Sequence, residues 1–168
     1  MKIFRRYQAR TLSIAVFIAC LGIATFATAQ IPDVSGWQII WHDEFGGTAV
    51  DTGQWVPLDR RNSFNNERQY YHPDQVTVAD GNLQLTAINV PRQGKAYQSG
   101  LVTSKIPFGL EQPDSGYTAL RVEARIKLAT SRGMWPAFWM NPNELIGWPK
   151  GGEIDILENK GHEPNRVS

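Results

Sequence analysis

Three carboxylates within six residues are the feature that most constrains what this chain can fold into. The run GEIDILE, residues 152–158, alternates acidic with aliphatic side chains. Such alternation is typical of a β-strand, in which residues i and i+2 share a face. We therefore expect Glu153 and Asp155 to point the same way, while Ile154 and Ile156 point into a core.

A β-bulge is needed to bring the third acid to the same face. Glu158 lies five positions after Glu153, which is the wrong parity in a regular strand. One extra residue near Ile156-Leu157 would restore it, and bulges re-aim side chains at active sites. The two glutamate Cα atoms would lie ~13 Å apart along the strand, and glutamates that lean together would approach the ~5–5.5 Å carboxyl separation of a retaining glycosidase. The alternative is a solvated acidic edge strand, against which the interleaved Ile-Ile-Leu argues.

The acidic run and four other segments together resemble the family 16 glycoside hydrolases. GEIDILE is similar to the ExDxxE signature of the laminarinase-like, agarase and carrageenase branches. The likeness extends from about Trp37 to the last residue, follows the order of the family and points to the endo-β-1,3-glucanases. The other segments are WHDEF at 41–45, NNERQYY at 65–71, EARIK at 123–127 and GMWPAFWM at 133–140.

The resemblance implies a retaining mechanism and a role for each acid. Glu153 would be the nucleophile and Glu158 the general acid/base. Asp155 would hydrogen-bond the nucleophile and tune the coupled titration. Two close carboxyl groups push their pKa values apart, so that one can stay protonated and serve as the acid.

Aromatic side chains near the acids suggest a sugar-binding surface. Trp135 and Trp139 share one strand face, and flat indole rings can cover the apolar faces of sugars. Both tryptophans could instead belong to a core, and Trp148 is open to either interpretation. Asn66 resembles a sugar-contacting asparagine of the family, although Asn-Asn-Glu is equally typical of a turn.

No cofactor is expected to be required. The resemblance makes Glu44 a candidate ligand for the structural calcium site of many relatives, and it assigns no metal to this chain with certainty. The three histidines have no ligand spacing, and we expect structural or exposed roles for His42, His72 and His162.

The first 29 residues resemble a secretory signal peptide. An apolar stretch at 12–26 precedes Ala27-Thr28-Ala29, an A-x-A cleavage site. The stretch is too short for a membrane-spanning helix and contains Thr and Ser. We therefore expect an extracellular or periplasmic protein that has no membrane attachment after cleavage. The basic residues of the signal are Lys2, Arg5, Arg6 and Arg10.

Cleavage would change the charge balance of the chain. Removing those four basic residues from 17 leaves 13 against 16 acidic residues, a net charge of −3. No basic patch then favours nucleic acid as a partner. A mildly acidic chain with six tryptophans fits a neutral polysaccharide such as a β-glucan, and we expect it to be a monomer.

The rest of the chain alternates short strands with turns. Val76–Val78 and Leu83–Thr86 flank Asp80-Gly81, a hairpin signal, and the longest alternation runs from Leu120 to Leu128. This pattern predicts an all-β sandwich, and the resemblance makes it a concanavalin-like jelly roll. Residues 30–168 would be the N-terminal part of the catalytic domain, truncated at its C-terminus, because such domains often need about 200–250 residues.

The leading hypothesis is a secreted endo-glycosidase that cuts β-1,3 linkages in laminarin-like or mixed-linkage glucans. One alternative is a galactan hydrolase of the agarase or carrageenase kind. The other is a non-catalytic glucan-binding module, against which three intact and mutually repelling acids argue.

Overall fold

The computed structural model describes residues 1–7, 36–61, 66–109, 117–142 and 146–167. The chain divides into two compact units, Met1–Glu123 and Ala124–Ser168. The described residues form β-strands and one short 3-10 turn, η1 (Pro73–Gln75), so the predicted all-β class is confirmed. Among these residues, no helix is long and apolar enough to cross a membrane.

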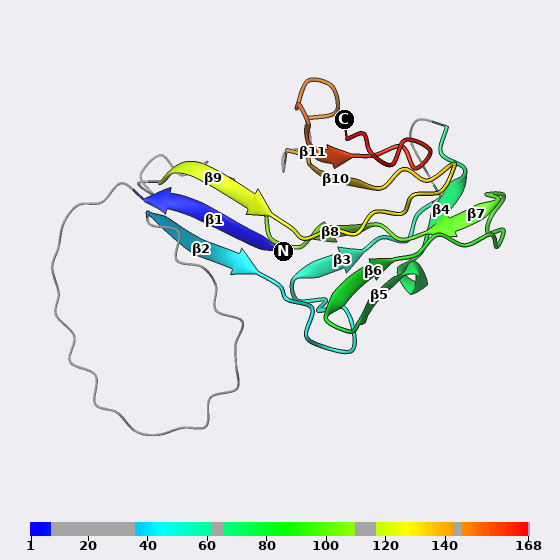
Figure 1. The fold of residues 1–168 in the computed structure, drawn as a ribbon, viewed down its shortest axis with the longest axis horizontal. Coiled ribbons are helices and arrows are strands. Elements are labelled where there is room, and N and C mark those ends of the chain that lie inside the picture. The colour runs from blue at the N-terminus through cyan, green and yellow to red at the C-terminus, as the bar shows by residue number, and fades with distance from the viewer. Residues whose placement is uncertain (8–35, 62–65, 110–116, 143–145, 168) are drawn as a thin grey trace, which may run out of the picture. The chain divides into compact units, whose positions relative to one another are not determined.

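A three-stranded antiparallel sheet is the largest sheet among the described residues of the first unit. Strand β1 (Lys2–Tyr7) lies between β2 (Trp37–His42) and β9 (Tyr117–Glu123), as Figure 1 shows. The alternation predicted to continue to Leu128 ends at Glu123, five residues early. Strand β9 ends there because its partner β1 begins at Lys2, and Lys2 pairs with Glu123. Residues after Glu123 have no described strand beside them with which to pair in this sheet.

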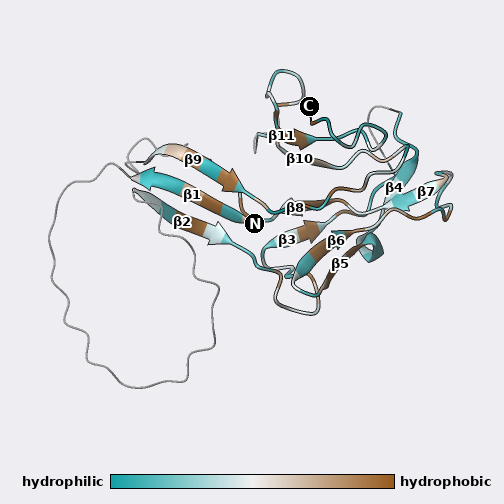
Figure 2. Cartoon of the chain, viewed as in Figure 1, coloured by the Kyte–Doolittle hydropathy of each residue, from teal (hydrophilic) through white to brown (hydrophobic). Residues whose placement is uncertain are grey.

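Strand β1 consists of residues that the sequence assigned to a signal peptide. Ile3 and Phe4 are the most buried apolar side chains of the described chain, at 1% and 2% exposure. The strand is apolar in its middle and hydrophilic toward its end (Figure 2). Cleavage after Ala29 stays a prediction, because residues 8–35 lie outside the part of the chain that the structure describes.

Among the described residues, the hydrophobic core of this unit consists of three buried residues, Ile3, Trp41 and Trp55. The rings of Trp41 and Trp55 meet edge to face, 5.2 Å between centroids, a geometry that aromatic pairs prefer. Asp43 ties the strand end to this core: its Oδ1 accepts from the Phe45 amide at 2.7 Å and its Oδ2 from the Trp55 indole at 2.8 Å. The WHDEF segment therefore has a structural role: it connects the end of β2 to the hydrophobic core.

Three further strand pairs complete the first unit. The predicted hairpin is confirmed: β5 (Val76–Ala79) and β6 (Asn82–Leu85) pair across Asp80 (φ 51°) and Gly81 (φ 70°). Two successive positive φ values are typical of a type I′ turn. The pairs are β3 (Trp55–Pro57) with β8 (Val102–Ser104), β4 (Gln69–Tyr71) parallel to β7 (Tyr97–Ser99), and β5 (Val76–Ala79) with β6 (Asn82–Leu85).

The second unit contains one antiparallel pair, β10 (Ala137–Met140) and β11 (Ile154–Glu158). The prediction that Ile154 and Ile156 point into a core is wrong, since they are 62% and 38% exposed. A two-stranded sheet has two faces, and the side chain of Ile154 lies on one that is largely exposed.

Candidate active site

The register of β10 and β11 contains the predicted bulge. Phe138 pairs with Leu157 and Trp139 with Asp155, so the ladder shifts by one residue between them. Ile156 is the extra residue, opposite no single partner. The expectation of a bulge near Ile156-Leu157, drawn from the parity of the acids alone, is confirmed.

The bulge places Asp155 and Glu158 on one face. Residues directly opposite each other in an antiparallel pair share a face, and Trp139 pairs with Asp155 while Ala137 pairs with Glu158. Trp139 and Ala137 are two apart and therefore also share a face. In a regular ladder without the bulge at Ile156, Glu158 would pair with Pro136. Its side chain would then point to the opposite face of the sheet from Asp155.

Glu153 precedes the first residue of β11 and lies two positions before Asp155. Partial desolvation, together with the negative charges of Asp155 and then Glu158, raises the pKa of Glu153 above its ordinary value. Like charges act in this way because they disfavour a further ionised carboxylate nearby. The three acids therefore form one electrostatically coupled group, which we call the acid cluster.

The three tryptophans predicted for sugar binding lie in the same unit as the acid cluster. Trp135 is 56% exposed and Trp148 77% exposed, so neither is a core residue of this unit. Trp139 is half-buried and stands directly across from Asp155. An indole ring beside a carboxylate can contact the apolar face of a sugar while the carboxylate binds its polar groups. Ligand sites commonly combine aromatic side chains with a few polar groups in this way. Sugar contact by these three rings stays a prediction.

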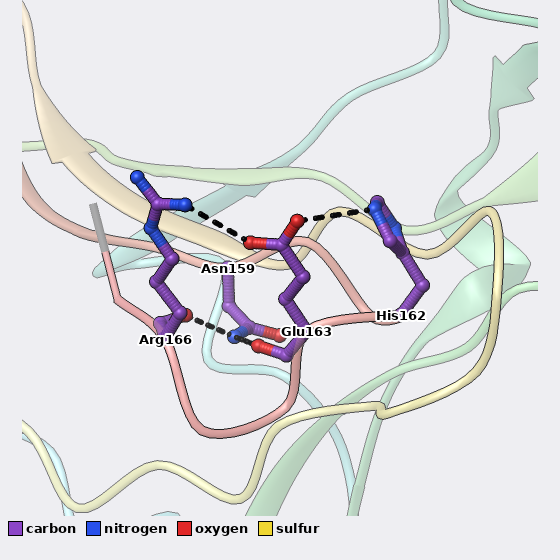
Figure 3. A network of polar contacts seen from close by, with 4 residues as sticks. All are labelled: Asn159, His162, Glu163 and Arg166. Atoms are coloured by element: carbon purple, nitrogen blue, oxygen red, sulfur yellow. Dashed lines mark hydrogen bonds and ion pairs between the residues drawn. The ribbon is translucent and has the colours of Figure 1, made fainter.

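Asn159 directly follows Glu158 and is fully buried. Its side-chain amide donates to two carbonyls, Glu163 O at 3.2 Å and Arg166 O at 2.6 Å, as Figure 3 shows. Its backbone amide donates to Pro136 O at 3.1 Å. Asn159 therefore holds the segment after the acid cluster against the strand that faces it.

Gly161 completes this attachment. Its amide donates to Met134 O at 2.8 Å, and a Cβ atom here would meet Ser131 O at 2.1 Å, a distance that real side chains do not reach. Sequence reasoning missed Asn159, because an asparagine before Lys-Gly is indistinguishable from an ordinary turn residue. Only its burial, a tertiary property, identifies it.

Asn66 belongs to the first unit, so its position relative to the acid cluster is not described. Asn66 is exposed and has φ 60°, a left-handed conformation that asparagine tolerates better than most residues. This supports the turn interpretation, and sugar contact by Asn66 stays a prediction. The tyrosine hydroxyl of Tyr71 donates to Glu67 at 3.0 Å, and burial together with Glu67 raises the pKa of Tyr71 to about 12. This part of the NNERQYY segment is a structural network.

Glu44, the candidate calcium ligand, is engaged in an ion pair in this structure. The Glu44 carboxylate pairs with the Lys2 ammonium at 3.4 Å, and both oxygens of neighbouring Asp43 already accept hydrogen bonds. Within the described chain, no group of three His, Cys, Asp or Glu side chains could hold a metal ion. Calcium at Glu44 stays a prediction without a ligand set, and no chemical step below uses it.

Comparison with known proteins identifies the family of this chain. The model of the family described as beta-glucan synthesis-associated protein SKN1/KRE6/Sbg1 matches residues 15–147, more than half of the chain. The chain belongs to this family. The matched range of the SKN1/KRE6/Sbg1 family ends before the acid cluster.

Similar proteins carry the likeness further along the chain. A glucan endo-1,3-beta-glucosidase A1 of Niallia circulans is 33% identical over 86% of this chain and 23% of its own length. A beta-glucanase of Rhodothermus marinus is 29% identical over 99% of this chain and 58% of its own. The solved endo-beta-1,3-glucanase from Pyrococcus furiosus is 29% identical with a TM-score of 0.58, over 78% of this chain and 53% of that one.

These matches confirm the resemblance to laminarinase-like family 16 glycoside hydrolases and the jelly-roll fold class. The chain spans between 23% and 58% of the length of the relatives named here. The activity of the whole protein is therefore a matter for proposal and test.

Replacing Asn159 by Ala should loosen the segment that follows the acid cluster. The carbonyls of Glu163 and Arg166 each lose one donor, and a hydrogen bond of this kind contributes about 0.5–1.5 kcal/mol. Amide hydrogen exchange should accelerate correspondingly at Glu163 and Arg166, whose amides donate to Lys160 O and Glu163 O. Arg166→Ala is the matched control, because its 77% exposed side chain makes only a surface ion pair at 3.4 Å while its carbonyl is retained. Equal exchange in the two variants would contradict the role of Asn159.

Removing either neighbouring charge should lower the pKa of Glu153. Asp155→Asn and Glu158→Gln each delete one like charge that raises it, and carbon-detected NMR titration of the Glu153 carboxyl measures the result. Because folding raises this pKa, the group favours the folded state most at low pH and less as pH rises through the raised value. Glu163→Gln, outside the acid cluster, should leave the titration unchanged. An unchanged pKa in Glu158→Gln would show that the bulge does not bring Glu158 to the face of Glu153.

Proposed function

We propose that this protein is a secreted, retaining endo-glycosidase that hydrolyses β-1,3-linked glucans, with Glu153 and Glu158 as its acid pair. The observation that carries the proposal is the one-residue register shift at Ile156. It turns Glu158 to the face of Asp155, and retaining hydrolysis requires two carboxyl groups about 5–5.5 Å apart that flank the scissile bond.

In the first step, a Glu153 carboxylate oxygen attacks the anomeric carbon of the glucan. The new carbon–oxygen bond forms as the glycosidic bond breaks, and Glu158 gives its proton to the departing sugar oxygen. In the second step, Glu158 takes a proton from water, the water oxygen attacks the same carbon, and the bond to Glu153 breaks. The product keeps the configuration of the substrate.

The coupling within the acid cluster sets the pH range of this chemistry. Glu153 must be ionised to attack, and its raised pKa means that it loses its proton at a higher pH than an isolated glutamate. The rate therefore falls as pH drops through that value. Removing the negative charge of Asp155 or Glu158 would lower the pKa of Glu153.

A neutral polysaccharide fits the surroundings of the cluster. Trp135 and Trp148 expose their rings in the same unit, and the net charge of −3 expected after cleavage of a signal offers no attraction for polyanions. The relatives named above act, by their names, on 1,3-beta-glucan or beta-glucan, which supports a β-1,3-glucan here. Export and a monomeric state are part of the proposal.

A non-catalytic glucan-binding or glucan-synthesis role is the second candidate. Its support is that the SKN1/KRE6/Sbg1 match covers residues 15–147 and so stops before the acids. Binding alone gives no reason to cluster three mutually repelling carboxylates within six residues, whereas hydrolysis uses each of them. Hydrolysis is therefore the better supported of the two.

The acid pair is tested in the full-length protein with laminarin as substrate. Glu153→Gln should abolish hydrolysis, because an amide cannot form the glycosyl ester. Glu158→Ala should lose about 10²–10⁴-fold in rate on laminarin, and added azide should restore turnover of an activated aryl glycoside, which needs no proton on its leaving group. Glu163→Gln serves as the matched control, being a glutamate of the same unit that pairs with Arg166, and should keep normal activity.

Near-normal activity in Glu153→Gln or Glu158→Ala would contradict the assignment of roles. Parallel digests of laminarin, lichenan and agarose separate the substrate hypotheses. Product from agarose alone would favour a galactan hydrolase, and retained laminarin binding without product from any of the three would favour the binding module.

A further inference from the structure

The ladder between β10 and β11 consists of two stretches whose registers differ by one residue. On one side of the bulge Trp139 pairs with Asp155, and on the other side Ala137 pairs with Glu158. Only this second register brings Glu158 to the face of Asp155. A bulge leaves its extra residue, here Ile156, unpaired and interrupts the ladder. The second register therefore depends on contacts that lie beyond the bulge.

The second register continues past the end of β11 through two backbone hydrogen bonds. The Asn159 amide donates to Pro136 O at 3.1 Å, and the Gly161 amide donates to Met134 O at 2.8 Å. Both pairs continue the register of the Glu158 pair, because one step forward on one strand matches one step back on the other. In the first register Glu158 itself would lie opposite Pro136, and both of these bonds would be lost.

The side chain of Asn159 compensates for a hydrogen bond that Pro136 cannot make. Proline has no backbone N–H, so the pair of Pro136 and Asn159 contains one backbone hydrogen bond where such a pair ordinarily has two. The Asn159 side-chain amide adds two bonds, to Glu163 O and Arg166 O. On its other side, Asn159 forms an antiparallel bridge with Val167. Asn159 is thus held from two sides, and a shift by one residue would break all of these contacts.

Gly161 fits this register because it has no side chain. A Cβ atom at this position would meet Ser131 O at 2.1 Å and the Cβ atom of Met134 at 2.9 Å. Only glycine permits such a close approach of two backbones, and the hydrogen bond to Met134 O depends on it. Asn159 and Gly161 therefore fix the same register in two independent ways, one by a buried amide and the other by the absence of a side chain.

We propose that Asn159 is the positioning residue of the general acid, because it holds the register that keeps Glu158 on the face of Asp155. The inference rests on the proposed function, in which Glu158 gives its proton to the departing sugar oxygen. Without Asn159, the end of β11 can relax toward a regular ladder, which turns the Glu158 carboxyl group away from that oxygen. Glu153 lies before the bulge, so its attack on the anomeric carbon keeps its geometry.

The proposal predicts a loss of rate that depends on the leaving group. In the full-length protein, Asn159→Ala should lower kcat on laminarin by about 10-fold or more, as part of the about 10²–10⁴-fold that a general acid contributes, and leave KM nearly unchanged. The first-turnover burst from an activated aryl glycoside should keep its rate, because a good leaving group departs without a proton. Added azide should restore its steady-state turnover. Arg166→Ala is the matched control and should keep the rates of the unaltered protein on both substrates.

NMR spectroscopy tests the register independently of activity. Asn159 and Pro136 form a hydrogen-bonded pair, so the adjacent residues Ala137 and Glu158 form a non-hydrogen-bonded pair, in which the Cα atoms lie closest. A cross-strand contact between the Hα atoms of Ala137 and Glu158 should be present in the unaltered protein. It should weaken or vanish both in Asn159→Ala and in Gly161→Ala, whose new methyl group cannot fit beside Ser131.

Retention of the Hα contact at full strength in Asn159→Ala would overturn the proposal. An equal loss of laminarin hydrolysis and of the aryl glycoside burst would also overturn it, whether or not the variant folds, because it would show a general structural defect. Normal laminarin hydrolysis by Glu158→Ala would instead contradict the proposed function, and the Hα contact would still show whether Asn159 holds the register.

Discussion

The strict alternation of side chains along a β-strand is the constraint on which both units of this protein depend. In β1 it sends Ile3 and Phe4 to opposite faces, and both are enclosed, so this short strand binds the sheet from two sides. In β11 the same alternation would separate the acids, and one extra residue at Ile156 corrects it. A one-residue change of register is enough to reverse either arrangement.

The chemistry follows from that corrected alternation. Partial desolvation, together with the negative charges of Asp155 and then Glu158, raises the pKa of Glu153, so the residue assigned as nucleophile ionises at a higher pH than an isolated glutamate. The segment after the cluster is secured by Asn159, a buried amide that donates to two carbonyls. Because Asn159 adjoins Glu158, the same attachment fixes the end of β11 from which this acid projects.

Local patterns in the sequence were sufficient for some elements and insufficient for others. The hairpin at Asp80-Gly81 and the bulge at Ile156 were predictable, because turn chemistry and parity are properties of neighbouring residues. The insertion of β1 was not, because its partners Leu120 and Val122 lie more than one hundred positions away. The same basic and apolar residues match a signal peptide equally well. The exposure of Ile154 and the burial of Asn159 were missed for the same reason, since burial depends on what the rest of the chain places nearby.

Trapping the covalent intermediate tests the central claim most directly, which is that the bulged strand presents an acid pair for retaining hydrolysis. An activated 2-deoxy-2-fluoro glucoside slows both steps and allows the glycosyl-enzyme to accumulate, and peptide mass spectrometry of the full-length protein then locates the sugar. The account predicts one glycosyl group per molecule, attached to Glu153. An adduct on Glu158, or turnover that proceeds with inversion and without any adduct, would contradict it.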